Sequence, residues 1–176
     1  MVFKDIFHAY NKLVFNVALH YVQNREDAEE ITQDVFVKIH KKLDSFQQKS
    51  TIKTWIYRIA INQSLDFIKA QKTQKRSFLS SLFSINNEKK EIDVPHFNHP
   101  GVQMEQKEAL ENIFTAINKL PDNQKTVIIL LKIEQKNQEE TALIMEISIK
   151  AVEALFQRAK KNLANLLNKA KENEKS

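Results

Sequence analysis

The segment from Ile147 to Leu163 places basic, acidic and amide side chains along one side of a predicted helix. Its apolar residues repeat at helical spacing on the opposite side, so the polar side chains would face away from the core. Basic groups can contact DNA phosphates, whereas carboxylate and amide groups can hydrogen-bond base edges in the major groove. The pattern alone is compatible with a DNA-reading surface and, equally, with an ordinary solvated helix face.

The residues before this helix add a second feature that is compatible with DNA reading. Asn137 can cap a short helix that ends near Met145, and Ser148 can cap the longer helix, which gives a helix-turn-helix arrangement. In such a unit the first residues of the second helix lie against base edges. The predicted base-reading residues are Lys150, Ala151, Glu153, Ala154 and Gln157, and the predicted phosphate contacts are Arg158, Lys160 and Lys161. A plain helical hairpin is the alternative.

A second polar surface carries negative charge within a basic chain of net charge +5. Glu26, Asp27, Glu29, Glu30 and Asp34 project from the outer side of a helix predicted to begin after Asn24. The helix dipole explains acidic residues in the first turn, but Asp34 lies beyond that turn. These carboxylates would repel DNA, and we interpret them as a docking surface for a basic protein.

A third cluster mixes aromatic, amide and cationic side chains within "TWIYRIAINQSLDFIKAQKTQKR". Aromatic rings can stack on unpaired bases while cations follow the phosphates. Trp55 is expected to anchor the core, whereas exposure and burial are equally compatible with the positions of Tyr57 and Asn62. The cationic members of this cluster are Arg58, Lys69, Lys72, Lys75 and Arg76.

Helices must position all three surfaces. The 42% of hydrophobic residues supports a sizeable core, and one glycine in 176 residues favours an all-α fold over hairpins or phosphate-binding loops. Periodicity predicts three helices, with the third running from about Thr51 to Ala70, and a second helical set after Gly101 in which Asp122 caps a helix. The stretch from 71 to 101 is predicted to be a linker; its apolar patch "FLSSLF" could dock or form a partial helix.

Other functions find little support. The chain has no cysteine, its five histidines lack metal-binding spacing, and no nucleophile lies beside a plausible base, so we predict neither an enzyme nor a metal or cofactor site. No transmembrane segment or signal peptide is evident, so we expect a soluble, cytoplasmic protein without membrane insertion or a small-molecule substrate.

The three surfaces, in this order, resemble those of bacterial sigma factors of the sigma-70 family, in the extracytoplasmic-function (ECF) group. "DAEEITQDVFVKIHKKLDSF" resembles the region-two segment that docks on the β′ clamp helices of RNA polymerase, and "TWIYRIAINQSLDFIK" resembles the adjoining segment that melts and reads the −10 element. "LPDNQKTVIILLKIEQKNQEETALIMEISIKAVEALFQRAKKNL" resembles region four, which binds the −35 element and the β flap.

This resemblance implies roles for individual residues. The resemblance assigns polymerase binding to Asp27, Glu30, Gln33 and Asp34. Binding of −10 DNA falls to Ser50, Lys53, Tyr57, Arg58, Asn62 and Lys69, with residues 44–53 forming a loop that captures a flipped base. Binding of −35 DNA falls to Ser148, Lys150, Ala151, Glu153, Ala154, Gln157, Arg158 and Lys161. Phe36 is expected in the core.

The resemblance also implies two small helical domains joined by a flexible linker: residues 1–75 as region two, 76–104 as linker, 105–170 as region four and 171–176 as a charged tail. The implied partners are core RNA polymerase, promoter DNA and an anti-sigma factor. Glu146 and Gln135 stand where relatives often carry glycine, and Ile61 stands where many carry arginine. The alternatives are a helix-turn-helix regulator with an N-terminal sensing or dimerising domain, and a helical adaptor that binds only proteins.

Overall fold

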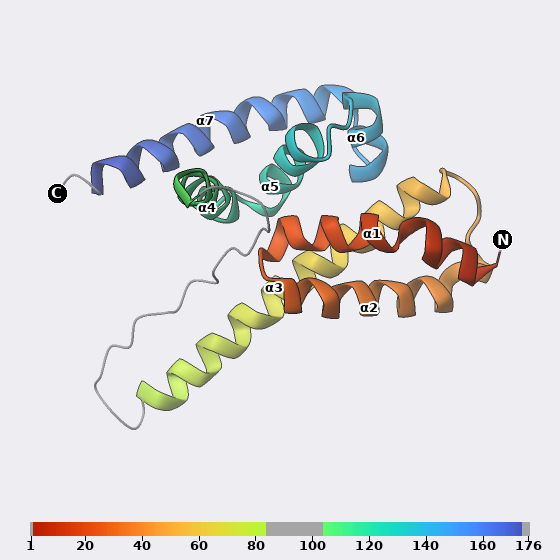
Figure 1. Ribbon diagram of the computed structural model, residues 1–176. Coiled ribbons are helices and arrows are strands. Elements are labelled where there is room, and N and C mark those ends of the chain that lie inside the picture. Colours follow the sequence, from red (N-terminus) through yellow and green to blue (C-terminus); the bar gives the residue numbers. More distant parts are fainter. Residues whose placement is uncertain (1, 84–103, 174–176) are drawn as a thin grey trace.

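The computed structural model of the protein describes residues 2–83 and 104–173, and every regular element within these ranges is helical. Helices α1 (Phe3–Val22), α2 (Arg25–Lys42) and α3 (Ile52–Phe83) form an N-terminal unit, with a 3-10 turn, η1 (Leu43–Ser45), after α2. Helices α4 (Met104–Asn118), α5 (Asp122–Ile128), α6 (Gln138–Met145) and α7 (Ile149–Asn173) form a C-terminal unit. The expected all-α fold is confirmed (Figure 1).

Side-chain caps mark the starts of α2 and α3. The Asn24 side chain accepts a hydrogen bond from the Asp27 backbone N–H (3.0 Å) at the start of α2. At the start of α3, Thr51 Oγ1 accepts one from the Thr54 backbone N–H (3.1 Å). Such caps form because the first N–H groups of a helix have no partner within the helix. The three helices bury their apolar faces against one another. Phe36 is 4% exposed, as expected of a core residue.

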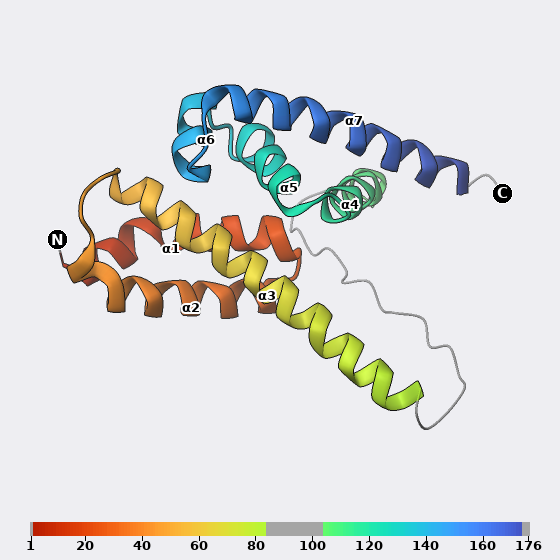
Figure 2. The same ribbon diagram turned by 180° about the vertical axis from the view of Figure 1, so that it is seen from behind.

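Helix α3 is longer than predicted. It continues through residues 71–83, which the sequence assigned to the linker, and extends away from the rest of the molecule (Figures 1 and 2). The Gln71 side chain donates to Asp27 of α2 (3.2 Å), and the segment contains neither glycine nor proline to interrupt a helix. The "FLSSLF" patch lies in this helical extension, whereas residues 84–103 lie outside the described part of the chain.

The C-terminal unit differs from the prediction in two details. Asp122 is the first residue of α5 rather than its cap, which is Pro121, because proline fits the extended backbone that precedes a helix. Helix α7 continues to Asn173, so the expected tail at residues 171–176 begins as helix. A π-helical turn, η2 (Ile129–Ile133), follows α5, and the backbone N–H of Glu134 closes it on the carbonyl of Ile129 (2.9 Å).

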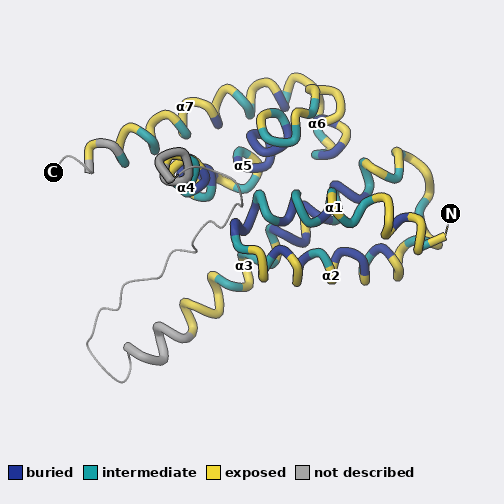
Figure 3. The backbone as a smooth tube through the Cα atoms, in the orientation of Figure 1, coloured by how far each residue is buried: buried dark blue, intermediate teal, exposed yellow. Residues whose placement is uncertain are grey.

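The two units pack against each other in the structure. Buried apolar residues form one cluster that runs through both units, and Figure 3 shows burial where they meet. Tyr21 of α1 donates its buried hydroxyl to Thr126 of α5 (2.8 Å), and the rings of His20 and Phe114 stack with centroids 6.5 Å apart. Helix α3 also contacts α6. The C-terminal unit therefore covers part of the N-terminal unit.

Candidate nucleic-acid interface

Helices α6 and α7 form the predicted helix-turn-helix. Asn137 and Glu140 make a reciprocal capping box at the start of α6, and Ser148 Oγ accepts from the Ala151 N–H (3.2 Å) at the start of α7. The intervening turn passes through Glu146 at φ 56°, the left-handed conformation that glycine adopts most easily. Val152 is fully buried where the two helices meet.

The polar surface of α7 is open to solvent. Ala151 is half-buried, and the other predicted −35 residues are exposed: Ser148, Lys150, Glu153, Ala154, Gln157, Arg158 and Lys161. Arg158 bonds to the Ala154 carbonyl of its own helix (3.3 Å), so its guanidinium lies close along α7. Lys160 lies 5.5 Å from the centroid of the Phe156 ring. The structure therefore gathers these residues on one accessible helix surface.

The loop before α3 surrounds a hollow of about 580 Å³. Asp44, Phe46, Gln48 and Ser50 are among its lining residues, and Gln48 takes a left-handed φ of 52°. The half-buried Trp55 packs on Phe46 with ring centroids 5.0 Å apart at the base of the loop. Of the −10 residues, Ser50 lines this hollow, and Lys53 lies exposed in the first turn of α3.

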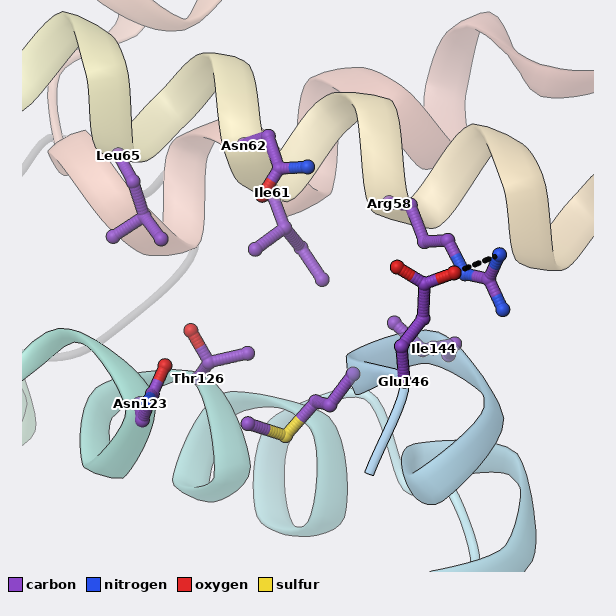
Figure 4. A pocket seen from close by; sticks show the side chains of 9 residues that line it. Arg58, Ile61, Asn62, Leu65, Asn123, Thr126, Ile144 and Glu146 are labelled. Atoms are coloured by element: carbon purple, nitrogen blue, oxygen red, sulfur yellow. Dashed lines mark ion pairs between the residues drawn. The ribbon is translucent and has the colours of Figure 1, made fainter. Parts of the chain in front are cut away.

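The remaining −10 residues lie along α3, on the side that faces the C-terminal unit. Tyr57 is 3% exposed, so its side chain is buried, and its hydroxyl donates to Glu134 (2.8 Å). Arg58 pairs with Glu146 (2.8 Å) and donates through Nε and Nη2 to the Leu143 carbonyl. Asn62 is exposed at a small pocket between α3, α5 and α6 (Figure 4).

Lys69 is the last of these residues, and its ammonium lies 3.2 Å from the Asp122 carboxylate at the start of α5. Both side chains are largely solvent-exposed, so this ion pair is weak. Together with Tyr57 and Arg58, it places three of the six predicted −10 residues in contact with the C-terminal unit.

Glu134 is the most connected of the residues that sequence reasoning did not select. Besides the Tyr57 hydroxyl, its carboxylate meets Nδ1 of His20 at 2.8 Å. Burial opposes ionisation, but the contacts from His20 and Tyr57 and the nearby Lys136 outweigh it, so the pKa of Glu134 lies below its ordinary value. Burial, with the Glu134 charge, raises the pKa of Tyr57, which keeps its hydroxyl protonated as the donor.

The predicted polymerase-binding residues share α2 but differ in their contacts. Glu30 and Gln33 are exposed. Asp34, although exposed, accepts a hydrogen bond from Gln63 of α3 (2.8 Å), and Lys38 donates to the same Gln63. Asp27 accepts from Gln71 in the same way. Two of the four carboxylate or amide groups therefore also hold α2 against α3.

No cluster of three or more potential metal ligands occurs among the described residues. None of the helices that the structure describes is long and apolar enough to span a membrane.

Comparison with known proteins assigns both units. The Sigma-70 region 2 family model matches residues 6–74, and the Sigma-70, region 4 model matches residues 110–163. The ECF RNA polymerase sigma-E factor of Haemophilus influenzae is 26% identical over 161 residues, covering 89% of this chain and 82% of the relative. The Escherichia coli K12 protein of that name is 27% identical over 156 residues, covering 89% and 81%.

Solved structures agree with this assignment. The sigma factor RpoE from Bartonella quintana, in complex with the anti-sigma factor NepR, has a TM-score of 0.64 at 25% identity, covering 94% of this chain and 96% of that chain. CnrH in complex with the cytosolic domain of CnrY, at TM-score 0.63 and 21% identity, covers 94% and 87% and supports the fold. The two family models cover most of the chain in the expected order, and this chain belongs to the sigma-70 family of bacterial RNA polymerase sigma factors, within the extracytoplasmic-function group.

Proposed function

We propose that this sigma factor binds core RNA polymerase through α2, opens and reads the −10 element with α3 and the loop before it, and reads the −35 element with α7. As a sigma factor the chain directs promoter recognition and transcription initiation. The observation that carries the residue assignment is the exposed polar surface of α7, displayed by a capped helix-turn-helix. The polymerase supplies the chemistry, and the factor supplies position and specificity.

The domain limits form part of this proposal. Residues 1–75 would bind polymerase and the −10 element, and residues 105–170 the −35 element and the β flap. The residues between them would connect the two units across the polymerase. An anti-sigma factor is a proposed partner, because two similar sigma factors were solved in complexes with NepR and with CnrY.

Reconstitution with core polymerase tests the function directly. The purified chain is added to core enzyme free of other sigma factors, and transcripts from genomic DNA are mapped at their 5′ ends. We expect specific start sites that depend on this chain. A helix-turn-helix regulator, the main alternative, would instead bind duplex DNA stably by itself and direct no starts.

The polymerase-binding surface is best tested at Glu30. Asp34→Lys would also break the contact with Gln63, whereas Glu30 is exposed and has no ion-pair partner among the described residues. Glu30→Lys should weaken the association with core polymerase, as measured by labelled-sigma anisotropy, without changing thermal unfolding. Glu139→Lys, the same charge change at an exposed position of α6, is the control. Equal affinity in the two variants would contradict the assignment of α2.

The −35 surface is tested at Arg158. Arg158→Ala should weaken binding of the holoenzyme to its mapped promoters by about 1–3 kcal/mol if the guanidinium contacts a base. Lys169→Ala removes an exposed cation further along the same helix and should leave the −35 footprint intact. If the −35 footprint of Arg158→Ala were also unchanged, this would contradict the placement of α7 in the major groove.

A further inference from the structure

Glu153 is the only acidic residue between Ile149 and Lys171, a stretch of α7 whose other charged residues are all basic. Its side chain is exposed and has no ion-pair partner among the residues that the structure describes. Lys150 lies three residues earlier, at a spacing that brings opposite charges together on a helix, yet no ion pair joins the two. A free carboxylate therefore lies on a surface assigned to a polyanion.

The position of Glu153 within α7 brings it to the bases. It lies in the second turn of the helix, and the first turns of a recognition helix lie against base edges. The neighbouring Val152 is fully buried, which fixes the rotation of the helix and leaves Glu153 on the solvent side (Figure 3). Ala151 and Ala154 have only methyl side chains, so the longer Glu153 side chain extends beyond them.

A carboxylate in this place needs a hydrogen-bond donor from the DNA. Phosphates repel it, and only two bases offer a donor in the major groove, adenine at N6 and cytosine at N4. Guanine presents two acceptors, and thymine presents an acceptor and a methyl group. Adenine has the acceptor N7 beside its amino group, and this acceptor repels a second carboxylate oxygen. Cytosine offers its amino group without an acceptor beside it and is therefore the base that matches a carboxylate.

Gln157, one turn further along α7, provides a comparison. It is also exposed, and residues four apart lie on the same side of a helix. Its amide carries a donor and an acceptor, which suits the N6 and N7 groups of adenine. Glutamate and glutamine have the same length and shape, so the preferred base depends on the terminal group alone. An amide in place of the Glu153 carboxylate should therefore exchange a preference for cytosine for one for adenine.

We propose that Glu153 is a specificity-determining residue that selects cytosine in the −35 element, its carboxylate accepting a hydrogen bond from the N4 amino group in the major groove. This inference rests on the assignment of α7 to the −35 element in the proposed function. Arg158 and Lys161, on the same exposed surface, supply the positive charge that attracts the phosphates. Guanine or thymine in place of the cytosine would set an acceptor oxygen against the carboxylate. The promoters that this chain recognises therefore share a cytosine at one −35 position.

Selection of promoter DNA by the holoenzyme tests this proposal. The full-length chain is assembled with core polymerase, and bound DNA is recovered from a library in which the −35 region is random. The rest of the promoter comes from a start site mapped in the reconstitution assay. The test variants are Glu153→Ala and Glu153→Gln. Glu139→Gln, which removes one negative charge from an exposed position of α6, is the control, and circular dichroism checks that all variants are folded.

We expect the parent to favour cytosine over the other bases by about tenfold at one −35 position, as a single good base contact allows. Glu153→Ala should accept all four bases at that position, Glu153→Gln should prefer adenine, and neither should change the other positions. Glu139→Gln should select the same sequence as the parent. The loss of a negative charge by itself raises the affinity for every DNA sequence alike, so a changed base preference separates hydrogen bonding from general electrostatics.

A base analogue isolates the amino group. The base 2-pyrimidinone pairs with guanine but lacks the N4 amino group of cytosine. Placed at the selected position, it should weaken binding of the parent holoenzyme by about tenfold and leave binding of the Glu153→Ala holoenzyme unchanged.

Three outcomes would overturn the proposal: Glu153→Ala selects the same −35 bases as the parent, the position that it relaxes is not a cytosine–guanine pair, or the analogue binds the parent as tightly as cytosine does. In each case a selected −35 element with specific transcripts would leave the proposed function standing. A parent that selects no sequence in the −35 region would instead contradict the assignment of α7, and this inference with it.

Discussion

Glu134 joins the two units through a single carboxylate that contacts both His20 and Tyr57. Its position was not predictable, because the sequence around it indicates only a polar break after an apolar helix. The contact with Tyr57 spans 77 residues of chain, and no local pattern reports such a distance. The π turn before it sets the direction in which Glu134 leaves the helix.

The lowered pKa of Glu134 predicts a pH dependence. A carboxyl whose pKa is lower in the folded protein adds stability that is fully present above its ordinary value of 4.5 and is lost as the pH falls below it. The difference in melting temperature between the parent and Glu134→Gln should therefore be largest near neutral pH and shrink on acidification below 4.5. A difference that stays constant down to pH 3 would contradict the ionised contact.

Lys125 presents the opposite situation, a buried cation that lowers stability. It is 2% exposed and has no ion-pair partner among the described residues, and burial, assisted by Lys72, lowers its pKa to about 8. Burying an unpaired charge is unfavourable, so Lys125→Met should raise the free energy of unfolding by about 1–2 kcal/mol at pH 7.

The pH profile provides the check on Lys125. Between pH 8 and 10.5 the unfolded chain keeps the proton that the folded protein has lost, so the stability of the parent should rise with pH across that window. The advantage of Lys125→Met should fall over the same range. Urea unfolding at several pH values measures both quantities, and an advantage that does not change with pH would contradict the assignment.

At the scale of elements, the turns of this protein adopt left-handed conformations without glycine. The non-glycine residues with positive φ among those described are Gln23, Gln48, Gln135 and Glu146. The scarcity of glycine correctly indicated an all-helical protein, but it did not remove the need for such turns. The resemblance to sigma factors had marked Gln135 and Glu146 as positions where glycine often stands, and both are left-handed.

Gln135→Gly should therefore stabilise the protein by about 0.5–1 kcal/mol, because glycine reaches positive φ with less strain. Gln135 is exposed, so little side-chain contact is lost. Ala164→Gly, in the exposed middle of α7, is the matched control and should lower stability by a similar amount. Thermal unfolding followed by circular dichroism distinguishes the two, and a destabilised Gln135→Gly would show that its side chain has a role in the turn.

The starts of the helices were more predictable than their C-terminal ends. Asn24, Asn137 and Ser148 cap helices where the sequence placed them, because capping depends on a side chain and its immediate neighbours. The end of α3 was predicted about 13 residues too early, because the loss of apolar periodicity was taken as the loss of helix. Residues 71–77 carry no large apolar side chain, so apolar periodicity gave no signal for helix there.

At the scale of the whole molecule, the sequence predicted two units and their order but not their contact. The residues that make it, Tyr21 with Thr126 and Arg58 with Glu146 among them, are spaced too far apart along the chain to pair by pattern. Tyr57 shows the effect of this contact most clearly. Its side chain is buried in the structure, although its sequence position was equally compatible with exposure.

The continuous buried cluster predicts how the molecule unfolds. With the units packed together, differential scanning calorimetry of the parent should give one cooperative transition. Glu134→Gln with Glu146→Gln should separate this into two transitions, one for each unit. A control with Glu139→Gln and Glu153→Gln makes the same change in net charge at exposed positions and should keep one transition. Two transitions already present in the parent would indicate that the contact between the units contributes little to folding.

The packing of Trp55 on Phe46 has a practical consequence. Trp55 is the one tryptophan in the chain, and it lies on the N-terminal unit at the base of the loop assigned to base capture. The intrinsic tryptophan fluorescence of the protein therefore comes from this one site. The unlabelled protein therefore carries a fluorescence signal for events at that loop, because no other residue of the chain is a tryptophan.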